Sequence, residues 1–145
     1  MKKRIGEPWI PGPVYGALLP QFTVNLVVRD IEASIAFYSR VLEAHAHYAD
    51  PDFAALRVMG QEMMLHADHA YEHSPWAGPL QAHGARGVGA EMRLLGVDPD
   101  LVAELAREIG AIFQEVTVRG HGWREVMIRD PDGYVWAVGV ASPSA

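Results

Sequence analysis

Residues 23–42 read TVNLVVRDIEASIAFYSRVL, and the same plan returns at residues 91–109 as EMRLLGVDPDLVAELAREI. In each segment a short apolar strand pattern ends at an aspartate, Asp30 or Asp98, and a helical pattern follows. Aspartate is a preferred N-cap residue, so each helix is expected to begin directly after it. The two aspartates are 68 residues apart. The sequence therefore predicts two half-domains of similar size.

Each helical segment is followed by three short strand patterns that are separated by turn residues. The predicted strands span residues 44–49, 53–59, 62–67, 111–118, 123–129 and 134–140. Both halves therefore follow the order βαβββ, which predicts an α+β fold. We expect module 1 at about residues 22–68 and module 2 at about residues 88–140. The glycine- and proline-rich residues 69–87 are expected to form the linker between them.

Residues 1–21 differ from both modules. Their four prolines are expected to prevent a regular helix or a central strand, yet apolar residues such as Trp9 and Tyr15 are unusual in a free tail. The prolines are Pro8, Pro11, Pro13 and Pro20. We expect an N-terminal arm that packs on the body or on a second subunit and buries Trp9 and Tyr15. Residues 22–145 are expected to form a single domain.

Composition restricts the possible functions. With 145 residues, the chain is expected to form one domain with a shared core. The absence of cysteine excludes disulfides, thiolate metal sites and a cysteine nucleophile. A net charge of −6 argues against non-specific nucleic-acid binding, and no apolar run approaches the roughly 20 residues of a membrane helix. The negative charge makes a small-molecule partner the better expectation. Because Gly6 and Pro8 lie where a signal peptide needs apolar residues, we expect a cytoplasmic protein.

Two motifs resemble a known family. The first is Val28-Arg29-Asp30 followed by residues 34–38, and the second is Trp123-Arg124-Glu125 followed by residues 130–136. With these motifs, the chain resembles the vicinal oxygen chelate proteins, also called the glyoxalase / bleomycin resistance / dioxygenase superfamily, over about residues 22–140. The resemblance implies two βαβββ modules that curl around a cleft, commonly within a homodimer. Activity varies widely on this fold, so the fold alone does not predict one.

The resemblance also implies where metal ligands would lie. Metal-dependent members use His, Gln and Glu on the first and fourth strands of each module. These positions correspond to Thr23, Met64, Glu91 and Ala137, of which only Glu91 is a credible ligand. His66 lies two residues beyond Met64, on the same strand face. We therefore expect no metal cofactor, with a divalent ion held by His66, Glu91 and a further ligand as the alternative.

Other side chains are candidates for ligand binding, and for each a structural role is the competing interpretation. Asn25 can donate and accept hydrogen bonds from the opening strand, and Arg93 can pair with Glu91. Trp76 and Trp123 could stack on a planar ligand. The predicted ligand-binding residues are Asn25, Met64, His66, Glu91, Arg93, Trp76 and Trp123. Catalytic residues cannot be assigned.

The histidines have two interpretations. If their segment were helical, His66, His69 and His73 would share one face and, with His83 nearby, could bind a metal ion. In a linker they would instead be partly exposed polar side chains, and the mixed loop composition favours this second interpretation. His45 and His47 alternate on a predicted strand and are expected to face solvent.

Two functions are compatible with these features. The first is a protein resembling the bleomycin-resistance members, which sequesters an aromatic or apolar compound in the cleft. The second is a metal-dependent lyase, isomerase or dioxygenase, in which the metal would stabilise an enolate or oxyanion. The missing ligand positions favour the first.

Overall fold

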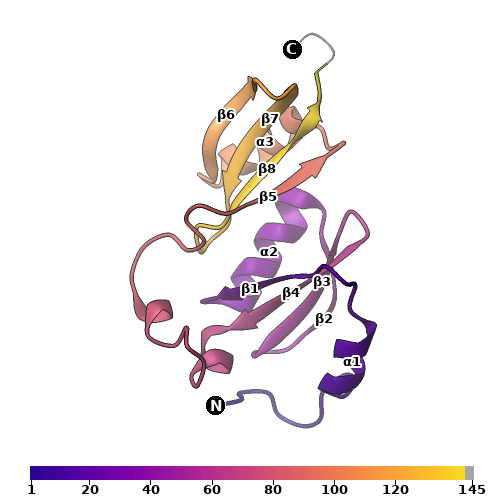
Figure 1. The fold of residues 1–145 in the computed structure, drawn as a ribbon, viewed down its shortest axis with the longest axis vertical. Helices are drawn as coiled ribbons and strands as arrows, with labels where there is room; N and C mark the ends of the chain where they lie inside the picture. Colours follow the sequence, from indigo (N-terminus) through magenta and orange to yellow (C-terminus); the bar gives the residue numbers. More distant parts are fainter. Residues whose placement is uncertain (143–145) are drawn as a thin grey trace. The chain divides into compact units, whose positions relative to one another are not determined.

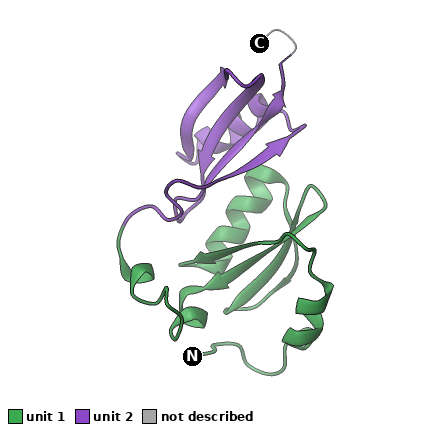
Figure 2. Cartoon of the chain, in the orientation of Figure 1, with its two compact units in different colours: residues 1–83 green, residues 84–145 purple. Residues whose placement is uncertain are grey.

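The computed structural model describes residues 1–142, so the last three residues of the domain expected at 22–145 lie outside the described part. The chain forms two compact units, one ending at His83 and the other beginning at Gly84 (Figure 2). Each unit contains one four-stranded mixed sheet and one helix packed on it. The two-module α+β plan predicted from the repeat is confirmed.

The first unit carries the first βαβββ module (Figure 1). The sheet order is β1-β4-β3-β2, with β1 parallel to β4. The Asp30 side chain caps α2 by accepting a hydrogen bond from the Ala33 N–H at 2.9 Å, as an N-cap does. The elements are β1 (Val24–Val28), α2 (Ile31–Leu42), β2 (His45–Ala49), β3 (Phe53–Val58) and β4 (Gln61–Ala67), followed by the short 3₁₀ helices η1 (Asp68–Tyr71) and η2 (Pro79–Gln81).

The second unit repeats the module. Its sheet order is β5-β8-β7-β6, with β5 parallel to β8. Asp98 caps α3 through the Asp100 N–H at 2.9 Å, and Trp136 is buried as expected for a core residue. The elements are β5 (Glu91–Leu95), α3 (Pro99–Glu108), β6 (Ile112–Val118), β7 (Trp123–Arg129) and β8 (Val135–Ala141).

The register of the two sheets matches the repeat. Asn25 pairs with Met64 across β1 and β4, and Arg93 pairs with Ala137 across β5 and β8. Asn25 and Arg93 each precede their capping aspartate by the same number of residues. Met64 and Ala137, which the family resemblance placed at equivalent positions, therefore occupy equivalent places in the two sheets.

The N-terminal arm contains a helix, α1 (Gly12–Leu18), which the sequence reasoning missed. The expectation that the prolines prevent a helix was wrong because Pro11 is the N-cap and Pro13 lies in the first turn. A first-turn residue has no intrahelical N–H bond to lose. The arm packs within the first unit, where Tyr15 is buried as expected, whereas Trp9 remains 43% exposed.

None of the helices within residues 1–142 has the length and apolar character required to cross a bilayer.

Candidate functional site

The sheet of the first unit has two different faces. Along β4, Met63, Leu65 and Ala67 are buried, and α2 packs on this sheet. Because alternate residues of a strand point to opposite faces, Met64 and His66 lie on the other face. Both of them line a cavity that the N-terminal arm covers. The alternation of side chains along β4 therefore gives the sheet one face toward the core and one face toward the cavity.

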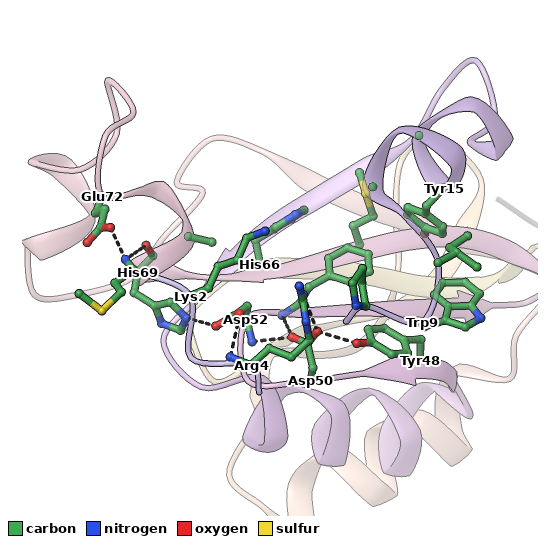
Figure 3. A pocket seen from close by; sticks show the side chains of 18 of the residues that line it. Lys2, Arg4, Trp9, Tyr15, Tyr48, Asp50, Asp52, His66, His69 and Glu72 are labelled. Carbon is green, nitrogen blue, oxygen red and sulfur yellow. Dashed lines mark hydrogen bonds and ion pairs between the residues drawn. The ribbon is translucent and has the colours of Figure 1, made fainter. Parts of the chain in front are cut away.

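This cavity, which we call the arm cavity, has a volume of about 460 Å³ and lies entirely within the first unit (Figure 3). Sites for small molecules typically measure about 300–1,000 Å³. One wall is formed by the arm and the other by the sheet, the turn between β2 and β3, and η1. The apolar lining includes Trp9, Ile10, Tyr15, Leu19, Phe53 and Met64.

Aromatic side chains connect the arm to the sheet. Trp9 stacks on Tyr48 of β2, with ring centroids 5.1 Å apart and planes 20° from parallel. Trp9 also meets Tyr15 at 5.5 Å, and Tyr15 meets Phe53 edge-on at 5.4 Å. Such offset and edge-on pairs are the favoured geometries of aromatic rings. They give the cavity a continuous aromatic wall.

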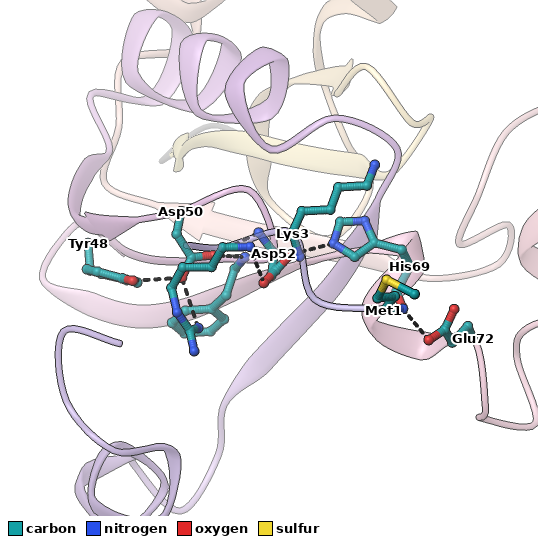
Figure 4. Close-up of polar contacts among 9 residues, drawn as sticks. Met1, Lys3, Tyr48, Asp50, Asp52, His69 and Glu72 are labelled. Carbon is teal, nitrogen blue, oxygen red and sulfur yellow. Dashed lines mark hydrogen bonds and ion pairs between the residues drawn. The ribbon is translucent and has the colours of Figure 1, made fainter. Parts of the chain in front are cut away.

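The turn between β2 and β3 binds the start of the arm through hydrogen bonds and an ion pair (Figure 4). Asp52 accepts hydrogen bonds from the backbone N–H groups of Lys3 at 2.7 Å and Arg4 at 3.1 Å, and its Oδ1 lies 2.5 Å from His69 Nε2. Burial alone would raise the pKa of Asp52, but these hydrogen bonds lower it to about 2. The neighbouring Asp50 pairs with the Arg4 guanidinium at 3.3 Å.

Two tyrosines that line the cavity donate their hydroxyl groups to carboxylates. Tyr48 donates to Asp50 at 2.7 Å, and this hydrogen bond raises the tyrosine pKa. Tyr15 donates to Glu62 at 2.7 Å, and burial together with this bond raises the pKa of Tyr15. Each hydroxyl therefore stays protonated and acts as a donor.

His47 does not face solvent as expected. Its Nε2 lies 2.7 Å from Glu62, and the side chain is only 14% exposed. Trp9 of the arm covers it, since the Trp9 and His47 rings meet edge-on with their centroids 5.3 Å apart.

His66 is held by a chain of side chains. Its Nδ1 lies 2.7 Å from Asn25 Oδ1, and Asn25 Nδ2 donates to the Tyr71 hydroxyl at 2.6 Å. The Tyr71 ring stacks on Trp76, with centroids 5.6 Å apart. Burial lowers the pKa of His66, opposed in part by the negative charge of Asp50. The predicted residues Asn25, His66 and Trp76 thus belong to one connected group.

A second polar group lies on the sheet of the second unit. The Arg93 guanidinium contacts Glu91 at 2.6 Å and Glu125 at 2.5 Å, and it lies 4.4 Å from the Trp123 ring centroid. Burial would lower the pKa of Arg93, but its contacts with Glu91 and Glu125 raise it. Glu125 is only 1% exposed and is also approached by Arg119 at 3.4 Å. The predicted residues Glu91, Arg93 and Trp123 therefore meet here.

The family model described as Glyoxalase/Bleomycin resistance protein/Dioxygenase superfamily matches residues 21–138. The chain belongs to this superfamily. The match begins where the N-terminal arm ends, so one wall of the arm cavity comes from the superfamily fold and the other from residues before it.

Solved structures of superfamily proteins have the same fold. A glyoxalase/bleomycin resistance protein/dioxygenase family enzyme from Burkholderia phytofirmans PsJN is 23% identical, with a TM-score of 0.68 over 82% of this chain and 96% of that one. A lactoylglutathione lyase from Agrobacterium tumefaciens is 20% identical, with a TM-score of 0.61 over 83% and 94% of the two chains. At such identities the likeness shows the fold and not the activity. Among curated proteins, none matches the sequence.

The donor set of this superfamily member does not fit the four-ligand metal site that the resemblance implies. Thr23, Met64 and Ala137 hold three of the four positions. The remaining donors already have partners, since His66 bonds to Asn25 and Glu91 to Arg93. Within residues 1–142, no group of three or more histidine and carboxylate side chains is placed to hold a metal ion.

The histidine cluster considered from the sequence of this glyoxalase-superfamily chain does not share a helix face. His66 lies on β4 and His69 on η1, where it pairs with Asp52. His73 follows η1 and is 93% exposed.

The structure divides the predicted site residues into two groups. Asn25, Met64 and His66 meet in the first unit, and Trp76 joins them through Tyr71. Of these predicted residues, Met64 and His66 line the arm cavity, whereas Asn25 and Trp76 do not. Glu91, Arg93 and Trp123 meet in the second unit. Sequence reasoning missed the cavity residues Arg4, Tyr48, Asp50 and Asp52, and it considered His69 only as a member of the histidine cluster. The apolar character of the arm was the available signal.

Proposed function

We propose that this superfamily member binds an aromatic or apolar small molecule in the arm cavity and does not use a metal ion. The observation that carries the proposal is a partly open cavity of about 460 Å³ with aromatic side chains on both walls. Burial of a planar ring against such walls is the main favourable contribution in sites of this kind.

The polar groups that line the cavity favour binding of an uncharged ligand. Asp50 and Asp52 line the cavity, but both carboxylates are already paired with the arm. His66 lines it as an imidazole whose pKa is lowered by burial, which favours the uncharged ring. An uncharged aromatic ligand would bury its surface without displacing these ion pairs.

The arm is expected to determine which ligand binds. It contributes Trp9 and Tyr15 to the aromatic wall, and it lies outside the superfamily match. A ligand that contacts both walls would therefore be selected by residues that the superfamily fold does not supply. This agrees with the wide range of ligands that one fold can accept.

The proposal is tested with 2-methoxynaphthalene as the probe, by isothermal titration of the intact protein. We expect saturable binding that weakens several-fold in Trp9→Ala, because the stacked wall is lost. Phe22→Ala is the matched control, since Phe22 is 85% exposed and does not line the cavity. The proposal would be wrong if neither this probe nor a panel of two- and three-ring aromatic compounds bound.

From the family resemblance we also propose a homodimer and, from the sequence expectation, a cytoplasmic location. Sedimentation equilibrium of the intact chain tests the first, and a single species of monomer mass would contradict it. Cell fractionation tests the second. The metal-dependent lyase, isomerase or dioxygenase gains no specific support from the donor set described above.

A further inference from the structure

The hydrogen-bond chain behind His66 determines which of its ring nitrogens carries a proton. Asn25 Nδ2 donates to the Tyr71 hydroxyl at 2.6 Å, so Asn25 presents its carbonyl oxygen Oδ1 to His66 Nδ1 at 2.7 Å. A carbonyl oxygen can only accept a hydrogen bond. Nδ1 must therefore be the protonated nitrogen, and in a neutral ring Nε2 is left as an acceptor.

The imidazole ring is held in place by its neighbours. Phe53 lies 4.9 Å from it and Tyr71 meets it edge-on at 5.5 Å, measured between ring centroids. His66 is one of the residues that line the arm cavity (Figure 3). Among residues 1–142, no side chain or backbone group makes a hydrogen bond with its Nε2. The acceptor is thus oriented in advance and has no partner within the described chain.

The surrounding charges are compatible with a neutral ring. Burial lowers the pKa of His66, and the Asp50 carboxylate opposes this only in part. The other titratable groups at the cavity come from the arm, from the strands β2 and β3 with their turn, and from η1 and the residues after it. They are the N-terminal ammonium of Met1, which pairs with Glu72, and the side chains of Lys2, Arg4, Tyr15, Tyr48, Asp50, Asp52, His69, Glu72 and His73. Tyr71, next to the ring, is already bonded to Asn25.

We propose that His66 Nε2 accepts a hydrogen bond from the bound ligand, and that the protein selects aromatic compounds carrying a hydroxyl or ring N–H group, such as phenols. The inference rests on the proposed function, since it assumes that the arm cavity is the binding site. The aromatic walls bind the ring system, and the histidine distinguishes a donor-bearing ring from an isosteric one. A site that accepts a hydrogen bond from its ligand binds an analogue without the donor less tightly.

The experiment compares 2-naphthol with 2-methoxynaphthalene, which differ by the replacement of an O–H donor with a methyl ether. We expect the intact protein to bind 2-naphthol about three- to tenfold more tightly, as one additional hydrogen bond allows. In His66→Phe this preference should disappear while the affinity for 2-methoxynaphthalene is kept. His66→Gln, which retains an acceptor oxygen, should recover part of the preference.

A second measurement on the unmodified protein does not depend on variants that fold. Long-range ¹H–¹⁵N spectra at neutral pH should show His66 as the Nδ1–H tautomer, with an Nε2 shift that changes when 2-naphthol binds. Because protonation of Nε2 removes the acceptor, the preference should be lost as the pH falls below the lowered pKa of His66. Binding of 2-methoxynaphthalene should change little over the same range.

The outcomes separate the inference from the proposed function. Equal binding of both compounds, a preference that survives in His66→Phe, or an Nε2–H tautomer would overturn the inference and leave the proposed function standing. Failure of both compounds and of the wider aromatic panel to bind would overturn both.

Discussion

Asp52, in the turn between β2 and β3, accepts a hydrogen bond from the backbone N–H of Lys3 at 2.7 Å. The two residues are 49 positions apart in the sequence, so this contact joins the N-terminal arm to the first module. The same carboxylate also accepts the Arg4 N–H and lies against His69. One buried acid therefore orders the start of the arm and a residue of η1, and both segments line the arm cavity.

Replacing Asp52 with Asn should destabilise the first unit by about 2 kcal/mol at neutral pH, because its pKa is lowered from 3.8 to about 2. A lowered folded-state pKa contributes stability above the unfolded-state value, and that stability is lost as the pH falls through the folded-state value. The unmodified protein should therefore lose stability between about pH 4 and pH 2, and Asp52→Asn should lose less.

Urea unfolding at several pH values measures both effects of Asp52→Asn. Glu7→Gln is the control, because it makes the same charge change at an exposed position of the arm. Equal acid sensitivity in Asp52→Asn and the unmodified protein would show that this carboxylate does not hold the arm.

Tyr15→Phe should cost about 1–2 kcal/mol, because a buried hydroxyl that donates to the Glu62 carboxylate is removed. Glu62 keeps its contact with His47, so the loss should stay below that of an unpaired buried charge. Thermal unfolding measures the cost, and limited proteolysis of the arm shows whether cleavage becomes faster. Phe22→Leu, at an exposed site near the arm, should change neither. An unchanged proteolysis rate in Tyr15→Phe would contradict this account of arm attachment.

Local patterns predicted the parts of the fold that depend on neighbours in sequence. The Asp30 and Asp98 caps located both helices, and alternation along β4 correctly placed Met64 and His66 on one face. The solvent exposure expected for His47 was wrong, because Trp9 of the arm covers this side chain and the pattern of β2 alone does not show that contact.

The arm cavity could not be predicted from local patterns, because it forms where the N-terminal arm packs against residues that are distant in the sequence. Nothing near Lys3 indicates that its N–H will meet Asp52, and nothing near Tyr15 indicates Glu62. Prolines were read as breakers of regular structure, yet Pro13 is tolerated in the first turn of α1. The sequence did predict that the arm packs, since its apolar residues are costly to leave in water.

Adding nickel, zinc, manganese or iron(II) should not raise the unfolding temperature of the intact protein. A ligand that binds the native state raises stability with its concentration, but three of the four superfamily ligand positions hold Thr23, Met64 and Ala137. Differential scanning fluorimetry with elemental analysis measures the effect. A stoichiometric ion that is lost in Glu91→Gln would contradict this prediction and favour the metal-dependent alternative.

In the second unit, Arg93→Met should cost about 3 kcal/mol, because it leaves the buried Glu125 charge without its nearest partner. Glu125→Gln should cost less, because Arg93 is partly exposed and keeps Glu91. The double variant should be more stable than the sum of the two losses predicts.

Arg107→Met provides the comparison in chemical denaturation. Arg107 forms an ion pair with Glu115 in which both side chains are more than half exposed, so the change should cost much less than Arg93→Met does. Similar costs for Arg93→Met and Arg107→Met would show that the buried Glu125 is not stabilised by Arg93.

Gly139→Ala should be among the most destabilising single changes in the second unit, by more than about 2 kcal/mol. A methyl group at Gly139 would overlap the Arg124 carbonyl oxygen and approach Glu125 Cα to 2.8 Å. Both obstacles lie in the backbone of β7, which pairs with β8 at this point, so neither can rotate away.

Gly120→Ala is the matched control, because a methyl group there meets nothing within 4 Å. Since Glu125 lies opposite Gly139 in the register, the missing side chain leaves room for the buried carboxylate. If Gly139→Ala unfolded at the same denaturant concentration as Gly120→Ala, the close approach of the two strands described here would be wrong.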